Sequence, residues 1–436
     1  MSLPAHTLLA QEARALITRL GRVRPFVLVE PMLTAAAPLP HTQSAIDGYL
    51  ARGRKELLGL VEQFLAWLQS PAGSQSSPEE AQRKFTMVRL RFNAVITQFD
   101  LFSDAITQRS EHETGVWLAG LDVASADALA LPAYYETPPV LCYLDRGVGA
   151  AIRRARTRLP GGGDNPVALI RVPRERMIGA SVSSSLVHEV GHQGAALLDL
   201  VPSLKAAMRE RAAANEAWKR FERWISEIVA DFWSVARVGI ASTVGLIGVV
   251  SLPRPFVFRM NDDDPHPMPW IRVMISAAIG AKLYPHEQWR QIAATWESFY
   301  PLPGLDESTA SLIQRLRAEI PAFVEFLAGH RPASLEGRSL AEALEPEERQ
   351  PVALMRHFAT WEAKPAAMYE APPALVFAVI GQARYLGKLT PEDESTLLAK
   401  LLTHWALKTT LDVSSYCGHH LHRNPRPAAD AASRLH

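Results

Sequence analysis

The sequence predicts an α+β protein that is predominantly helical and contains one small sheet. Apolar residues recur at spacings of three and four along much of the chain, which is the pattern of helices packed on a core. Only two short runs, Pro139 to Leu144 and Val167 to Val172, favour strands. With 436 residues, of which 48% are hydrophobic, the chain can bury a large core and is expected to divide into two or three units.

The first unit, residues 1 to 130, is expected to be an N-terminal helical region. Helical periodicity runs through Ala45 to Leu68 and through Glu79 to Phe102. The Ser/Pro/Gly-rich stretch Ser70 to Pro78 is expected to be the loop that joins these two helices.

The central unit, residues 131 to 300, begins with the two strand-forming runs. A helical stretch is predicted after the first of them, near Ala150 to Arg158. Gly161-Gly162-Gly163 predicts a turn rather than a phosphate loop, because no Lys-Ser/Thr pattern follows it.

The most informative stretch is His188-Glu189-Val190-Gly191-His192, an H-E-x-x-H motif. Ser183 to Ser185 offer N-cap oxygens before it, and apolar residues continue after it, so the motif is expected on a helix. Four residues is little more than one helical turn, so the imidazoles of His188 and His192 can converge on one metal ion. Glu189 lies about 100° round the helix, where it can take a proton from a water held on the metal.

A catalytic zinc ion needs a third protein ligand and an open position. One known arrangement has a Gly three residues after the second His and another His six residues after it. This chain has Ala195 and Leu198 there, so that arrangement is excluded. The other arrangement takes a carboxylate from a second helix downstream, and the amphipathic stretch Trp218 to Ala236 predicts such a helix.

Glu227 and Asp231 border the apolar stripe of that second helix. They are four residues apart, so their carboxylates face the same way. Glu227 is expected to bind the metal, and Asp231 to accept the remaining ring N–H of a ligating His. Glu216 and Glu222 are the fallback ligands, although neither has a carboxylate four residues further on.

His188-Glu189-x-x-His192 followed by Glu227-x-x-Ala230-Asp231 resembles the gluzincin group of zinc metallopeptidases, over roughly residues 138 to 236. In that group, H-E-x-x-H on one helix is completed by E-x-x-x-D on the next. The resemblance implies a zincin-like catalytic domain, in which the edge strand of a small sheet lines the cleft and two helices carry one catalytic Zn²⁺. It also implies a peptide or protein substrate. Val167 to Val172 is the candidate edge strand, which would hold a peptide by strand addition.

In such a site zinc lowers the pKa of its bound water toward about 7, and Glu189 accepts the proton. The hydroxide attacks a carbonyl that the metal polarises, and Glu189 returns the proton to the leaving amine. The developing oxyanion usually has a second donor. His266, in the stiff proline-rich loop before Arg272, is the candidate for this role, and Arg272, Tyr284 and Tyr300 are alternatives.

The other interpretation of that loop is a rigid surface segment in which Asp262 to Asp264 cap the following helix. A different function also remains open for the whole chain: a noncatalytic zincin-like protein whose metal or helical flanks serve assembly or partner binding. Turnover by the wild type and by Glu189→Gln would distinguish a peptidase from this alternative. The sequence does not indicate whether the protein is a monomer or an oligomer.

Composition argues against several other classes of protein. The formal net charge is +1, and no basic stripe is interleaved with aromatic residues, so no nucleic acid is expected as a partner. The two cysteines, Cys142 and Cys417, are far apart in the sequence, which indicates a reducing compartment rather than a disulfide framework. Charged residues, including Glu12 and Arg14, interrupt the first apolar stretch, so no signal peptide is expected. The prediction is a cytoplasmic protein.

One apolar stretch raises the question of a membrane. Residues Val238 to Pro253 carry no ionisable side chain. The stretch is shorter than the roughly 20 residues of a spanning helix and is interrupted by glycines. It is therefore expected to be a buried segment.

The last units are a C-terminal helical region, residues 301 to 415, and a His/Pro-rich tail, residues 416 to 436, expected to be flexible. Cys417 or a histidine of this tail could occupy the open zinc position and hold an enzyme inactive.

Each helix predicted in the C-terminal region begins near a proline or a capping residue: Glu307 to Ala328, Pro351 to Ala363, Pro373 to Leu386 and Pro391 to Leu407.

Overall fold

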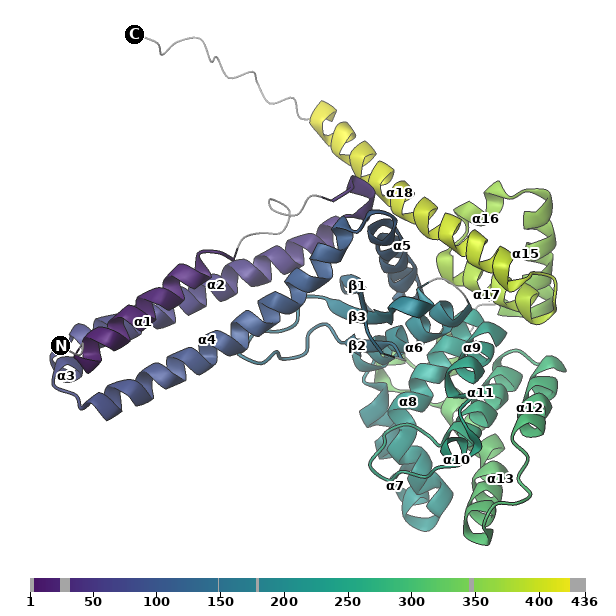
Figure 1. Cartoon of the computed structure of the whole chain (residues 1–436). Helices are drawn as coiled ribbons and strands as arrows, with labels where there is room; N and C mark the ends of the chain where they lie inside the picture. The colour runs from purple at the N-terminus through teal and green to yellow at the C-terminus, as the bar shows by residue number, and fades with distance from the viewer. Residues whose placement is uncertain (1–3, 24–31, 148, 178–179, 345–348, 424–436) are drawn as a thin grey trace.

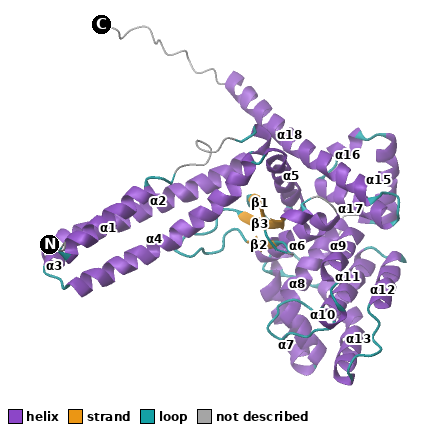
Figure 2. Cartoon of the chain, viewed as in Figure 1, coloured by secondary structure: helices purple, strands orange, loops and turns teal. Residues whose placement is uncertain are grey.

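The computed structural model describes residues 4–23, 32–147, 149–177, 180–344 and 349–423. Helices make up most of this part of the chain, and the described strands form one small sheet, which confirms the predicted α+β class (Figures 1 and 2). A long helical arm extends to one side of the sheet, and a larger helical body lies on the other side (Figure 1).

The arm consists of α1 (Ala5–Leu20), α2 (Pro40–Gln69) and α4 (Pro78–Thr107), with the short α3 (Pro71–Ser74) at its tip. Pro40 and Pro78 stand in the first turns of their helices, where a missing N–H costs no hydrogen bond. The α2 and α4 helices have 30 residues each, which is a length of about 45 Å. Their apolar stripes meet in a core of their own, and the helices predicted near residues 45–68 and 79–102 are confirmed.

The sheet contains β1 (Val140–Asp145), β3 (Ala168–Pro173) and β2 (Ala151–Arg153), in the order β1-β3-β2. The β3 strand is parallel to β1 and antiparallel to β2. Alternate residues face opposite sides: Leu141 and Leu169 join the core of the arm, whereas Cys142 and Ile170 join the core of the body. The sheet is therefore buried on both faces and connects the two parts of the molecule.

Two predictions for this region are wrong. The run Val167 to Val172 forms the central strand β3 rather than an edge strand, because β1 and β2 pair with both of its sides. The helix expected near Ala150 to Arg158 is instead the strand β2 and a turn, because pairing with β3 outweighs a local helical preference. The turn predicted at Gly161-Gly162-Gly163 is present, and all three glycines have positive φ.

One hydrophobic core runs through the body from Leu118 in α5 (His112–Leu129) to Trp405 in α18 (Pro391–Arg423). It does not divide near residue 130 or residue 300, where the sequence analysis placed boundaries. The remaining described helices are α6 (Ala180–Leu197), α7 (Leu200–Ala214), α8 (Glu216–Val238), α9 (Ile240–Val250), α10 (Arg254–Val257), α11 (Pro269–Leu283), α12 (Gln288–Phe299), α13 (Glu307–Gly329), α14 (Leu340–Leu344), α15 (Pro351–Ala363), α16 (Ala366–Glu370) and α17 (Pro373–Tyr385), with short 3₁₀ turns at Thr34–Ala36, Gln108–Ser110, Arg174–Arg176 and Ala333–Leu335.

The four helices predicted in the C-terminal region are confirmed as α13, α15, α17 and α18. The α18 helix continues to Arg423, so the first part of the expected flexible tail, from residue 416, is helical. Residues 424–436 lie outside the described part of the chain. The apolar stretch Val238 to Pro253 forms the short, mostly buried helix α9, and none of the described helices is long and apolar enough to cross a membrane.

The α6 and α8 helices pack against each other unusually closely, and two glycines of α6 make this possible. A Cβ atom added at Gly191 would come within 2.9 Å of the Cα and carbonyl oxygen of Ala230 in α8. A Cβ atom added at Gly194 would come within 2.5 Å of the Trp233 ring. No larger residue fits at either position unless the two helices separate.

We expect Gly191→Ala to lower the free energy of unfolding by about 1–3 kcal/mol, because the new methyl group meets backbone atoms that cannot move aside. The matched control is Gly248→Ala in α9, where the glycine is exposed and an added Cβ atom has nothing within 4 Å. That substitution should be neutral or stabilise by up to about 1 kcal/mol. Urea unfolding of both variants and the wild type measures the difference, and equal stability of the two variants would contradict the packing argument.

Candidate metal centre

The α6 and α8 helices bring the three predicted metal ligands together. Nε2 of His188 lies 3.3 Å from Oε2 of Glu227, and Nε2 of His192 lies 3.4 Å from Oε1 of the same carboxylate. One ligand atom from each of the three residues lies within 4.8 Å of the others. The helix of the motif begins earlier than expected, at Ala180, so Ser183 to Ser185 lie inside it and do not cap it.

The arrangement fits a divalent cation. Glu227 is 9% exposed at its side chain, and its buried Oε2 atom has no hydrogen bond. A buried carboxylate oxygen without a hydrogen bond is costly unless a cation lies beside it. Nη2 of Arg272 lies 3.7 Å from this oxygen, too far for a hydrogen bond, and a metal ion held by the two imidazoles would lie closer. Two imidazole nitrogens and one carboxylate oxygen are the donor set of many catalytic zinc sites, which keep one further position open. The residues present therefore fit zinc.

Asp231 contacts the ring nitrogen of His188 that lies on the far side from Glu227. Its Oδ1 atom lies 2.8 Å from Nδ1 of His188. Arg272 of α11 donates two hydrogen bonds to the same carboxylate, from Nε at 2.7 Å and from Nη2 at 2.9 Å. Nη2 of Arg272 also lies 3.4 Å from Nε2 of His188. The guanidinium thus fixes the carboxylate that in turn fixes the imidazole.

These contacts shift the pKa values of the site. Burial opposes protonation of His188, but the charge and hydrogen bond of Asp231 outweigh it and raise the pKa of His188 to about 9. Burial also opposes ionisation of Asp231, yet the charges of Arg272 and His188 lower the pKa of Asp231 to about 2. Burial opposes ionisation of Glu227 as well, but the imidazoles of His188 and His192, 3.3 and 3.4 Å from its oxygens, outweigh burial and hold the pKa of Glu227 well below its usual range. Both carboxylates are therefore ionised at neutral pH.

Glu189 lies beside this cluster. It is 9% exposed. Burial lowers the pKa of Arg272, but Asp231, then Glu227 and then Glu189 raise it through their negative charges. The interaction of Glu189 with Arg272 thus acts through charge. A carboxylate in this place, next to two metal-ligand candidates, is positioned as a general base would be.

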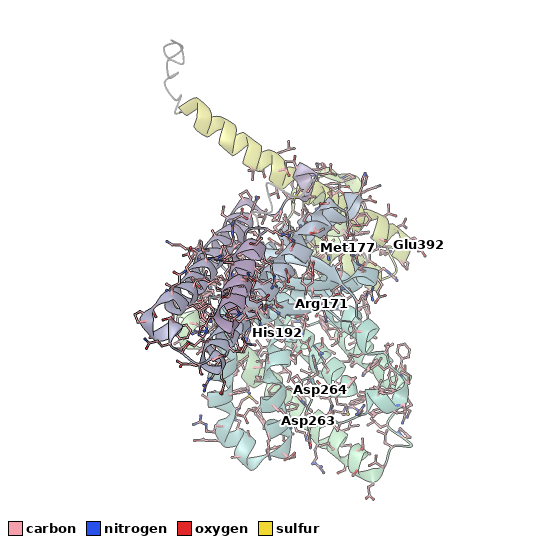
Figure 3. The ribbon with its side chains drawn as sticks, turned by 60° about the vertical axis from the view of Figure 1, so that its left-hand side comes forward. Arg171, Met177, His192, Asp263, Asp264 and Glu392 are labelled. Atoms are coloured by element: carbon pink, nitrogen blue, oxygen red, sulfur yellow. The ribbon has the colours of Figure 1, made fainter. Side chains whose placement is uncertain are left out.

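His266 also reaches the site, from the loop between α10 and α11. Its Nε2 atom lies 3.3 Å from Oε2 of Glu227, although its side chain is 49% exposed. Asp264 holds the ring, with Oδ1 lying 2.7 Å from Nδ1 of His266. Figure 3 shows His192 and Asp264 on the same side of the molecule. Asp264 orients His266 rather than capping α11, whose N-terminus at Met268 has no side-chain cap.

The alternative donors lie elsewhere. The hydroxyls of Tyr284 and Tyr300 donate to the backbone carbonyls of Ala236 and Leu252. Neither fallback ligand belongs to the His/His/Glu group: Glu216 pairs with Arg220, one turn further along α8, and Glu222 remains outside the group as well. Tail residues 417 to 423 lie in the last turns of α18, which extend away from α6 and α8 (Figures 1 and 3).

Sequence reasoning missed two parts of the site. The sequence suggested Arg272 only as a donor to the oxyanion. In the structure its guanidinium donates two hydrogen bonds to the carboxylate of Asp231. Asp264 was not given the role of orienting His266, although the D-x-H spacing within a proline-rich loop is a local signal for such a contact. A third residue, Gln193, follows His192 directly and accepts a hydrogen bond from the backbone N–H of Ala155 at 2.8 Å, which ties the end of β2 to α6.

No protein-family model, curated protein or solved structure matches this chain.

We expect Asp231→Asn to weaken zinc binding about 10- to 100-fold, because His188 loses the carboxylate that fixes its ring and raises its basicity. Competition with a chromophoric chelator measures the affinity. The control is Asp412→Asn, at an exposed position on α18, which should bind zinc like the wild type. A wild-type affinity in Asp231→Asn would show that this carboxylate does not support the metal.

Zinc binding should depend on pH through His188. Its raised pKa of about 9 means that the metal-free protein keeps a proton on this ring at pH 7. That proton stabilises the metal-free fold fully below about pH 6.5, and the contribution is lost as the pH rises through about 9. Zinc must displace the proton, so its apparent affinity should rise about tenfold per pH unit between pH 7 and 8.5, with release of about one proton. Titration calorimetry in buffers of different ionisation enthalpy counts the protons, and a flat affinity over this range would contradict the assignment.

Proposed function

We propose that this protein is a zinc-dependent peptidase that hydrolyses peptide bonds with Glu189 as the general base. The observation that carries the proposal is the convergence of His188, His192 and Glu227 from two adjacent helices. A hydrolytic centre also needs a residue that orients a ligating imidazole and a carboxylate beside the metal, and Asp231 and Glu189 lie in those places.

When bound, zinc supplies a Lewis acid that polarises a carbonyl and makes a coordinated water acidic near neutral pH. His188, His192 and Glu227 would hold it. Glu189 would accept the proton of the attacking water and return it to the leaving amine. Asp231 and Arg272 keep the His188 ring in one orientation throughout.

A peptide is the substrate class that the surroundings favour. The β2 strand is an outer strand of the described sheet, antiparallel to β3, and the Ala155–Gln193 hydrogen bond ties its end to α6 beside His192. An extended peptide can add to such an edge through backbone hydrogen bonds and so present a carbonyl to a nearby site. In this proposal β2 takes the role that the sequence analysis gave to residues 167 to 172.

The order of elements is also consistent with the zincin-like domain that the gluzincin resemblance implies. The small sheet with its antiparallel outer strand comes first, and the helices with H-E-x-x-H and E-x-x-x-D follow. The long helical arm and the C-terminal helices lie outside that arrangement.

The decisive test is Glu189→Gln, assayed with an unstructured protein substrate beside the wild type. The amide keeps the shape of the side chain but cannot accept the proton, so turnover should fall about 10²- to 10⁴-fold while one zinc ion per chain is retained. Glu222→Gln, at a partly exposed position of α8, is the matched control and should keep wild-type turnover.

Suppose that the wild type, Glu189→Gln and Glu222→Gln all retain zinc and yet cleave nothing in a broad peptide library. That result would favour the noncatalytic alternative, a metal-stabilised scaffold that binds partners. Zinc lost in Glu189→Gln would instead assign this carboxylate to metal binding.

A further inference from the structure

The loop between α10 and α11 places a third imidazole against the metal site, although nothing in the H-E-x-x-H pattern requires one. Nε2 of His266 lies 3.3 Å from Oε2 of Glu227, the same distance that separates this oxygen from Nε2 of His188. That oxygen is buried and has no hydrogen bond. Two imidazole nitrogens thus approach one carboxylate oxygen from two different elements.

Asp264 presets the ring for metal binding. Its Oδ1 atom lies 2.7 Å from Nδ1 of His266 and accepts a hydrogen bond from the backbone N–H of the same residue at 2.9 Å. A ring that donates from Nδ1 to a carboxylate carries its lone pair on Nε2, which is the atom directed at Glu227. The contact reproduces that of His188, whose Nδ1 lies 2.8 Å from Asp231.

Each of the three imidazoles lies at a ligand-to-ligand distance from one oxygen of Glu227, but His266 has to move toward His188 and His192 to share their ion. Zinc bonds to nitrogen and oxygen are roughly 2.0–2.1 Å long, so two ligand atoms of a tetrahedral ion are about 3.3–3.4 Å apart. The pairs that Glu227 forms with His188, His192 and His266 measure 3.3, 3.4 and 3.3 Å. His266 does not belong to the tight group in which all ligand atoms lie within 4.8 Å of one another, so it stands at the rim of the site.

The attachment of the loop allows His266 to move. Asp262 pairs with Arg220 at 3.0 Å and with Arg223 at 3.8 Å, which joins the loop to α8 one to two turns before Glu227. Asp262 and Asp264 are 71% and 45% exposed, and solvent-exposed ion pairs are weak. The loop is therefore held in place by contacts that a competing ligand can break.

We propose that His266 is a fourth, exchangeable metal ligand that closes the zinc site in the resting protein and gives way to substrate. The inference rests on the proposed metal centre and adds a regulatory element to it: the open position is occupied by the protein's own imidazole until a substrate displaces it. Asp264 is the positioning residue for this ligand, and the pair of Asp262 with Arg220 sets how readily the loop leaves.

The test uses the metal-free full-length protein with Zn²⁺ and with Co²⁺ as a spectroscopic substitute. We expect His266→Ala to weaken zinc binding at least tenfold. The visible absorption of its Co²⁺ form should also fall, because water molecules that enter the opened position raise the coordination number, and five- or six-coordinate Co²⁺ absorbs more weakly than four-coordinate Co²⁺. Asp264→Asn should give a smaller change in the same direction. His357→Ala, a partly buried histidine on α15, is the matched control and should match the wild type in both measurements. His188→Ala gives the background from histidines elsewhere in the chain.

Equal zinc affinity and an unchanged Co²⁺ spectrum in His266→Ala would overturn the inference and leave the zinc centre intact. If turnover fell in that variant with both metal measurements unchanged, His266 would be a donor to the oxyanion instead of a ligand. A wild-type protein that bound no more metal than His188→Ala would overturn the metal centre itself, and the inference with it. Because His266 is half exposed on a loop, its replacement leaves the core packing untouched.

Discussion

The close contact between α6 and α8 is the constraint on which the site depends. Each helix carries half of the candidate metal centre, and the helices meet at Gly191 and Gly194, where Ala230 and Trp233 fill the space that larger side chains would need. Gly191 lies between the two histidines, so the residue that permits the contact is part of the motif itself. The distance between helix backbones and the distance between ligand atoms are therefore set by the same packing.

Charge balance is the second constraint. Glu189, Glu227 and Asp231 bring three negative charges into a mostly buried space, and Arg272 supplies one lasting positive charge. With neutral imidazoles the site carries a formal charge of −2, which a divalent cation cancels. In the absence of the cation, a proton on His188 takes over part of this role, and that explains the raised pKa of His188 beside the lowered pKa values of both carboxylates.

The sequence predicted the parts of the fold that depend on local periodicity. The helices that became α2, α4, α8 and α13 were all visible in apolar spacing, and the i, i+4 geometry of Glu227 and Asp231 followed from the helix itself. What failed depended on contacts between distant segments. Residues 151–153 form a strand because they pair with β3. Arg272 donates to Asp231 because α11, which carries it, packs against α8. Neither partner is visible from the local sequence.

The two-sided burial of the sheet ties the arm to the rest of the molecule. Leu141 and Leu169 contribute to the core of the arm, while their neighbours in the same strands contribute to the core of the body. A chain shortened to begin after α4 would leave one face of β1 and β3 uncovered and apolar, and an exposed apolar face of this kind invites aggregation. The arm is thus an integral wall of the sheet, and attempts to isolate the metal-binding helices as a minimal fragment have to carry it along.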